Sequence, residues 1–307
     1  MTVSTTSSMP VPPGLVIAQQ LPDLLLPPKI RRGVLGFLRS NPTVAIGGAL
    51  LLCLVLIGMF APFLGTVDPT ALAPAKRLRA PSADFWFGTD LLGRDIYSRV
   101  LYGARVSLTV GLSVALLASL AGLAIGLVSG FVRLADSIIM RFMDGLMSIP
   151  PILLAVALMA LTRGSVGNVI MAITIAEIPR VSRLVRGVVL SLREQPYVDA
   201  ATASGTRTPM IILRHILPNT LAPMLVQATY VCASAMIVES ILSFIGAGTP
   251  PTIPSWGNIM AEGRALWQIK PYIVFFPAAF LSVTVLAVNL LGDGLRDALD
   301  PRMAKTL

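Results

Sequence analysis

Four ionisable residues lie inside, or at the rims of, long apolar segments: Asp144, Glu177, Arg180 and Glu239. A charge at the centre of a bilayer costs about 2.5–3.5 kcal/mol even on lenient insertion scales, so such side chains should face a helix bundle or a watery cavity. There they could meet a charged group of a molecule that crosses the membrane. Glu177 is the main candidate, because Pro179 loosens the helix beside it, and Asp144 and Glu239 are further candidates for a substrate pathway.

Each candidate also has a purely structural explanation. Asp144 follows Arg141 by three residues, which suits a local ion pair near the cytoplasmic rim. Arg180 follows Glu177 at the same spacing, so these two could neutralise each other, or Glu177 could pair with a partner subunit. Glu239 lies near the outer end of its apolar segment.

Other kinds of chemistry lack the residues that they need. No GxxxxGK[ST] sequence is present, so the chain cannot cradle the phosphates of ATP by itself, and no nucleophile–base constellation appears. Cys53 and Cys232 fall within apolar segments, and His215 is the single histidine, so neither a disulfide framework nor a metal site is predicted. We expect a protein that is not an enzyme and that binds no cofactor itself.

The composition is that of a membrane protein. Apolar residues make up 55% of the 307 residues and charged residues only 13%, against roughly 25% charge in soluble domains. The net charge of +9 is attributed to orientation in the membrane and contact with anionic lipid, not to nucleic acid.

Six segments are long and apolar enough to cross a membrane, which needs about 20 residues. They are residues 43–64, 107–132, 137–161, 169–190, 211–245 and 272–295. The third is interrupted by Pro150-Pro151, and arginines crowd the second half of the fourth. Glycines in the second segment should let helices pack closely. The expected fold is an all-α, polytopic membrane protein with six transmembrane helices.

The two ends of the chain have a different character. Residues 1–28 are rich in proline and contain no Lys or Arg, so they make a poor signal peptide and are predicted to be disordered. Residues 29–40 are predicted to form a basic amphipathic helix at the cytoplasmic surface, and residues 303–307 a short tail. The distribution of arginines favours cytoplasmic termini, and it places residues 194–219 in the cytoplasm.

Residues 194–219 contain a short helix signal between two apolar segments. Pro196 suits the first helical position, and Gly205 can close the helix in the left-handed conformation. Thr208 reads as the N-cap of the next helix, with Pro209 at its first position. Alanines and a serine between Pro196 and Gly205 leave a face on which another protein's backbone could approach closely. The alternative is an ordinary loop with a chance run of alanines.

The order Asp199-Ala200-Ala201, then Gly205, then Leu217-Pro218 resembles the EAA loop of ABC importer permeases. In that family the loop forms a coupling helix that docks into a groove of a cytoplasmic ATPase, so the resemblance implies this role for these six residues. Asp199 stands where the consensus has Glu. His215 stands where the general pattern prefers Ile, although residues 214–219 look like the version found in peptide permeases.

Residues 87–108 carry a second resemblance. Taken alone, Thr89-Asp90 and Arg94-Asp95 look like helix caps and surface ion pairs worth ~0–1 kcal/mol. As one string the segment resembles the signature ahead of the second helix in dipeptide, oligopeptide and nickel ABC permeases, where it marks the second (C-type) of two paired permeases. Residues 243–257 and 289–302 support this, and the resemblance covers about residues 41–302, the expected permease domain.

The outer loop at residues 247–271 contains Trp256 and Trp267. Their amphipathic rings could sit at the membrane interface, or the loop could form a periplasmic scoop that contacts a delivering protein.

The resemblance implies a type I ABC importer permease of a bacterial inner membrane that imports di- or oligopeptides. It implies a second permease, two ATPases that bind ATP and Mg²⁺, and an extracytoplasmic substrate-binding protein. Nickel, glutathione or opine-like solutes are alternative substrates. An ion-coupled secondary transporter is the alternative of another class, although no internal repeat is evident.

Overall fold

The computed structural model describes residues 34–299, and this part of the chain is helical without any strand. The helices are α2 (Val34–Ser40), α3 (Pro42–Met59), α4 (Ile96–Phe131), α5 (Arg133–Met147), α6 (Pro151–Ala160), α7 (Val166–Arg193), α8 (Pro196–Ala203), α9 (Thr208–Ile211), α10 (Leu217–Phe244), α11 (Trp256–Gly263) and α12 (Tyr272–Leu299). A π-helical turn, Ile212–Ile216, joins α9 to α10. The predicted tails, the first part of the amphipathic helix (29–33) and Arg302 lie outside the described residues.

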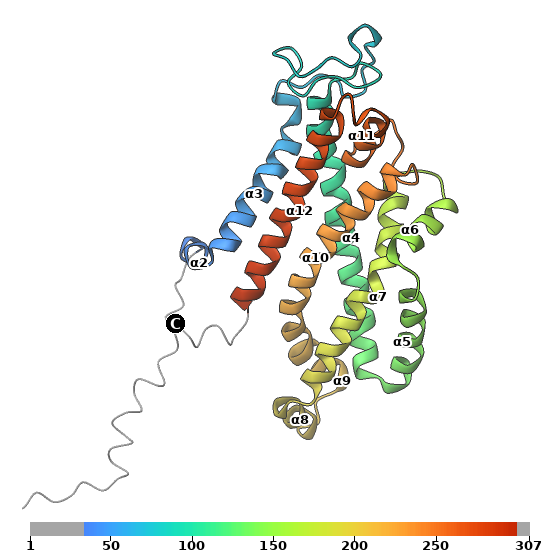
Figure 1. The fold of residues 1–307 in the computed structure, drawn as a ribbon. Helices are drawn as coiled ribbons and strands as arrows, with labels where there is room; N and C mark the ends of the chain where they lie inside the picture. The colour runs from blue at the N-terminus through green and yellow to red at the C-terminus, as the bar shows by residue number, and fades with distance from the viewer. Residues whose placement is uncertain (1–33, 300–307) are drawn as a thin grey trace, which may run out of the picture.

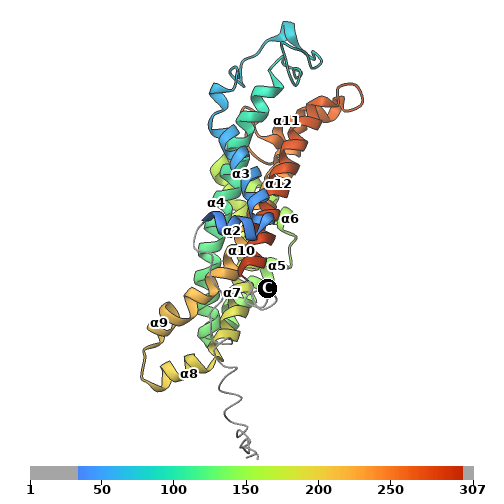
Figure 2. The same ribbon diagram turned by 90° about the vertical axis from the view of Figure 1, so that its left-hand side faces the viewer.

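The long helices form one bundle with different structures at its two ends (Figure 1). Helix α4 packs against α3, α7 and α10, and α12 packs against α3 and α10. The extended loop between α3 and α4 lies with α11 at one end, whereas α8 and α9 project from the other (Figure 2). The predicted coupling segment and the predicted outer loops therefore lie at opposite ends.

Four of the six predicted spans are confirmed as helices long and apolar enough to cross a membrane, whereas the third is bent and the fourth, which forms α7, is not among these helices. Helices α3, α4, α12 and the stretch Thr208–Phe244 are long and apolar enough to cross a membrane. The third span was predicted as one segment, but α5 and α6 meet at a bend of 87°. Pro150 and Pro151 explain the break, because proline lacks an N–H and disfavours helical geometry at the residue before it. Helix α7 is a continuous 28-residue helix, about 42 Å long, beside α4.

Helix α4 begins eleven residues before the predicted second span, at Ile96. Asp95 is its N-cap and accepts a hydrogen bond from the Ser98 backbone N–H at 2.8 Å. The added turns extend the helix to 36 residues and carry it into the outer layer of loops.

A row of glycines brings α4 and α7 into close contact. Three glycines of α4 each face a valine of α7, and a Cβ atom added to any of these glycines would lie 2.6 Å from a side-chain atom of that valine. The facing pairs are Gly122–Val181, Gly126–Val185 and Gly130–Val189. Small residues four apart allow this approach where lipid supplies no hydrophobic drive between helices.

A buried network of four charges connects the loop before α4 to α11. The Asp90 carboxylate accepts hydrogen bonds from Arg94 at 2.7 Å and from Arg99 at 2.6 Å, and Glu262 bonds both arginines. The sequence predicted surface pairs here, which is wrong: Asp90 is fully buried, and Arg94 pairs with Asp90 and Glu262 instead of Asp95. Glu262 lies more than 160 residues away in the sequence, so local spacing could not reveal it.

Trp256 is also buried, which contradicts one of the two alternatives for its loop, a ring at the membrane interface. Its indole N–H donates to the Val100 carbonyl at 3.0 Å, and Gly103 leaves room for the ring. Trp267 remains more than half exposed. Of the two rings in this loop, Trp267 alone has the exposure that an interfacial ring requires.

The close approach of α4 to α7 predicts an unequal effect of two small substitutions. Gly126→Ala is expected to destabilise the protein by about 1–3 kcal/mol, because the new methyl group overlaps Val185. The matched control is Gly187→Ala on α7, where a Cβ meets no atom within 4 Å. Thermal unfolding of both variants in one detergent measures the difference, and equal midpoints would contradict the tight contact.

The charge network predicts a second stability difference. Asp90→Asn keeps the shape of the side chain but leaves two buried arginines facing one carboxylate, so we expect a loss of about 3–5 kcal/mol. Asp84→Asn, at an exposed position of the same loop, should change stability little. Thermal unfolding again checks the pair, and a tolerated Asp90→Asn would show that the network contributes little.

Candidate functional site

The predicted coupling segment forms a helix with well-defined ends. Helix α8 begins at Pro196 and ends at Ala203, and Gly205 has a φ of +77°. The Gly205 N–H bonds the Thr202 carbonyl at 3.0 Å, and the next N–H, of Thr206, bonds the Ala201 carbonyl at 3.1 Å. These two bonds form a Schellman cap, which requires a left-handed residue at Gly205. The predicted helix and its glycine terminator are confirmed.

Helix α8 presents a small, exposed face at the end of the bundle (Figure 2). Val198 is 4% exposed and anchors the helix, and Ala201 packs partly against the core. Asp199 and Ala200 are exposed, and Tyr197 is 41% exposed. Apart from Tyr197, the exposed side chains of the helix are small, so the helix can enter a groove of another protein.

The connection from α8 to α10 contains an irregular turn that the sequence analysis did not predict. Helix α9 starts at Thr208, with Arg207 as its N-cap, one residue before the predicted cap. In the following π-turn the Leu217 N–H bonds the Ile212 carbonyl, five residues back. Pro218 has no N–H to offer the carbonyl four residues before it, which favours the wider turn. Leu217 and Pro218, two of the predicted coupling residues, open α10 directly after it.

His215 lies in this π-turn, and its ring is 6.2 Å from the ring of Tyr197 at the start of α8. The contact joins the two ends of the coupling segment. The sequence marked His215 only as a departure from the EAA pattern, and no spacing pointed to Tyr197.

Glu177 lines a hollow of about 430 Å³ between α6, α7, α10 and α12. The carboxylate is 1% exposed and accepts a hydrogen bond from the Ser234 hydroxyl on α10 at 3.0 Å. The second carboxylate oxygen lies 3.2 Å from the Arg180 guanidinium, which is half-exposed. The predicted pairing of Glu177 with Arg180 is confirmed, whereas a place for Glu177 in a substrate pathway stays a prediction that its position beside the hollow supports. Tyr230 and Asn289 are further lining residues that the sequence analysis missed.

Asp144 is not part of this hollow. Its partner is Arg183 on α7, not Arg141 as its spacing suggested, and both side chains are about half exposed. A second pair on the same side joins Asp136 on α5 to Arg186 on α7, with contacts of 2.5 and 2.6 Å. These pairs hold α5 against α7, and the exposed Asp144 pair is worth ~0–1 kcal/mol.

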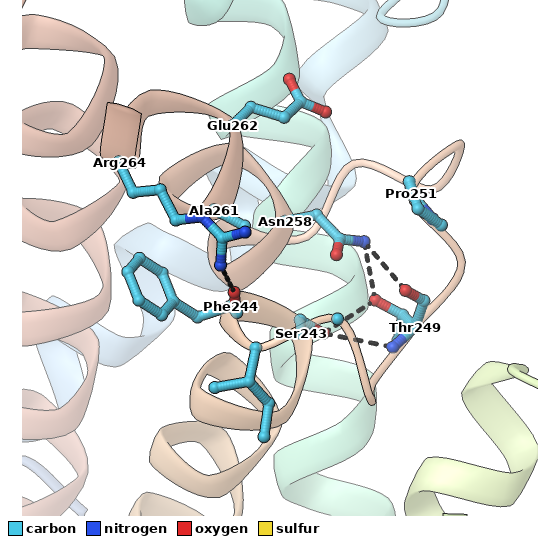
Figure 3. Close-up of a pocket in the computed structure, with 10 residues that line it drawn as sticks. Ser243, Phe244, Thr249, Pro251, Asn258, Ala261, Glu262 and Arg264 are labelled. Atoms are coloured by element: carbon cyan, nitrogen blue, oxygen red, sulfur yellow. Dashed lines mark hydrogen bonds between the residues drawn. The ribbon is translucent and has the colours of Figure 1, made fainter. Parts of the chain in front are cut away.

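Glu239 is likewise separate from the hollow. Its carboxylate is fully buried and accepts a hydrogen bond from the Ser243 hydroxyl at 2.8 Å. The Ser243 hydroxyl lies 3.0 Å from that of Thr249, which accepts a hydrogen bond from the Asn258 amide (Figure 3). The Thr249 hydroxyl also donates to the Ser255 hydroxyl. This cluster ties the outer end of α10 to the loop before α11, so Glu239 has a structural position in this conformation.

Comparison with known proteins agrees with this architecture. Residues 119–305 match the family model described as the binding-protein-dependent transport system inner membrane component. A probable peptide ABC transporter permease of Sinorhizobium fredii is 54% identical, covering 86% of this chain and 90% of that protein. A dipeptide transport system permease of Alkalihalophilus pseudofirmus is 42% identical, covering 87% and 88%. A glutathione transport system permease of Pectobacterium atrosepticum is 40% identical, covering 87% and 89%.

Among solved structures, an inward-facing form of the MetNI methionine ABC transporter matches with a TM-score of 0.54. The match has 18% sequence identity and covers 66% of this chain and 96% of the other chain, so it supports the fold alone. The matching family model and the relatives indicate a transport permease, and helix α8, which follows the EAA pattern, agrees with this. The chain belongs to the family of binding-protein-dependent transport system inner membrane components.

Proposed function

We propose that this chain is the permease subunit of an ATP-driven importer of di- and oligopeptides. The observation that carries the proposal is helix α8, a capped and exposed helix of small residues at one end of a permease fold. Relatives named as peptide and dipeptide permeases, which this chain matches over most of its length, support peptides as the substrate.

The proposal assigns a partner to each end of the bundle. Helix α8, with Asp199, Ala200 and Ala201, docks into a cytoplasmic ATPase, and ATP and Mg²⁺ bind to two such ATPases. The loops around α11 face the extracytoplasmic binding protein, and a second, homologous permease completes the translocation pathway. Closure of the ATPase dimer moves the coupling helices and shifts the bundle between inward-open and outward-open states.

Glutathione is the second candidate substrate, because a glutathione permease shares 40% identity with this chain. Nickel and opine-like solutes remain further alternatives. The test is uptake by vesicles that contain the whole transporter and its binding protein, with labelled dialanine and glutathione supplied separately. We expect ATP-dependent uptake of dialanine that persists when the proton gradient is dissipated. Uptake that follows the gradient and ignores ATP would instead identify a secondary transporter.

The cap of α8 provides a prediction for coupling. Gly205→Val should abolish most peptide uptake while the chain still inserts, because a β-branched residue resists the positive φ of +77°. Gly205→Asn is the matched control, since asparagine tolerates this conformation and a Cβ there meets no atom within 4 Å. ATP-dependent uptake and co-purification of the ATPases measure both effects. Normal transport by Gly205→Val with ATPases bound would refute the coupling role.

The proposed orientation, with both termini in the cytoplasm, predicts two labelling results. A cysteine at the exposed Ser82 position should react with a membrane-impermeant thiol reagent added to intact cells with a permeable outer layer. A cysteine at the exposed Thr202 position on α8 should react only after the inner membrane is permeabilised. Labelling of Thr202→Cys in intact cells would show that the orientation is reversed.

A further inference from the structure

The hollow beside Glu177 contains several polar groups that the protein itself leaves unused. Among the described residues, no hydrogen bond involves the side chains of Tyr230 or Asn289, and the Arg180 side chain takes part only in its ion pair with Glu177, although all three line the hollow. The remaining walls are mostly apolar, formed by Ile152, Ile237 and their neighbours. A few convergent polar groups in an apolar hollow of about 430 Å³ are typical of a small-molecule site.

The pair of Glu177 and Arg180 is incomplete as an ion pair. Their nearest atoms are 3.2 Å apart, yet the Glu177 oxygen on that side has no hydrogen-bond partner among the described residues, although it is buried. A buried charged oxygen without a hydrogen bond is costly, so the site gains free energy from any donor that reaches it. Arg180 is half-exposed and has guanidinium N–H groups to spare.

We propose that Glu177 and Arg180 form a binding subsite for the charged ends of a zwitterionic peptide. The ligand's carboxylate draws the Arg180 guanidinium away from Glu177, and its ammonium group replaces that guanidinium at the Glu177 carboxylate. Ser234 holds the other carboxylate oxygen in place through its 3.0 Å hydrogen bond. This inference rests on the proposed function, in which the chain carries peptides.

Charge balance favours a zwitterion over a ligand with a single charge. Glu177 and Arg180 together are neutral, and a ligand with one positive and one negative group leaves every charge paired after the exchange. A purely cationic ligand would leave Arg180 without its anion, and a purely anionic ligand would leave Glu177 buried and unpaired, which is costly.

Protection of a cysteine in the hollow tests this proposal without requiring transport. The reporter is Ile237→Cys, a lining position that is 40% exposed, in the whole transporter with Cys53→Ser and Cys232→Ala. N-ethylmaleimide labels the thiol, and the labelling rate is measured against increasing dialanine. The matched ligand control is N-acetyl-dialanine amide, which has the same backbone and no charges. The matched reporter control is Leu225→Cys, exposed on the same helix but outside the hollow.

We expect dialanine to slow labelling of Ile237→Cys in a saturable manner and the blocked peptide to leave the rate unchanged. In Glu177→Gln and in Arg180→Gln, the concentration that gives half-protection should rise about tenfold or more, as expected when one charge-assisted hydrogen bond is lost. Arg180→Gln changes a half-exposed side chain, so it reports binding even if Glu177→Gln disturbs folding. A Leu225→Cys thiol that is labelled at the same rate with and without the Glu177 or Arg180 substitution shows that the variant is correctly folded.

Three results would overturn the proposal. The first is equal protection by the blocked peptide, and the second is protection that survives in both variants. The third is an Ile237→Cys thiol that reacts but that dialanine never protects. A thiol that never reacts would overturn the proposal as well, because the hollow is then closed by a partner in the assembled transporter. Dialanine uptake by the same vesicles is a separate measurement, so a transporter that carries peptides without this subsite is recognised as such.

Discussion

The close contact between α4 and α7 is the constraint on which the rest of this structure depends. A bilayer supplies little drive for helices to associate, so they must gain contact energy by approaching closely. The facing pair of Gly126 and Val185 shows how this is achieved, since even a methyl group on the glycine would overlap the valine. Helix α7 carries Glu177 and Arg180 on the turns next to this contact, and it leads directly into α8. The position of α7 therefore determines where both candidate sites lie.

The two candidate sites are connected through the same pair of helices. Helix α8 lies between α7 and α10 in the sequence. Both α7 and α10 line the hollow beside Glu177. Glu177 and Arg180 come from α7, while Tyr230 and Ser234 come from α10. A displacement of α8 would therefore act on both walls of the hollow. The Schellman cap at Gly205 and the π-turn before α10 are the local structures through which such a displacement would pass.

The opposite end of the bundle is held together by buried polar contacts. Asp90, Arg94, Arg99 and Glu262 join the first outer loop to α11, and the hydroxyl cluster at Glu239 joins α10 to the same region. Removing one member of such a network leaves an unpaired buried group, so these contacts resist local opening. The candidate surface on α8, at the other end of the bundle, is by contrast exposed and made mostly of small side chains. Buried ion pairs and hydrogen bonds therefore stabilise one end of the bundle, whereas the other end presents an exposed helix of mostly small residues.

The sequence by itself determined the membrane class, the approximate spans and the coupling helix. These features depend on local properties: apolar length sets a span, proline starts α8 at Pro196, and glycine ends it at Gly205 because few other residues adopt a positive φ. Pro150-Pro151 already indicated a break in the third span, although not its bend of 87°. The order of small residues that resembles the EAA loop is equally local.

Only the tertiary structure decided which charges and aromatic rings meet. Spacing along the chain assigned Asp144 to Arg141 and Arg94 to Asp95, whereas the folded protein pairs Asp144 with Arg183, and Arg94 with Asp90 and Glu262. An interfacial ring was one of two alternatives for Trp256, which is buried against α4 instead. Helical spacing constrains only neighbours within a turn, while these partners lie up to 168 residues away. Helix packing determines the distances between segments that are far apart in the sequence, so these partners could be identified only from the tertiary structure.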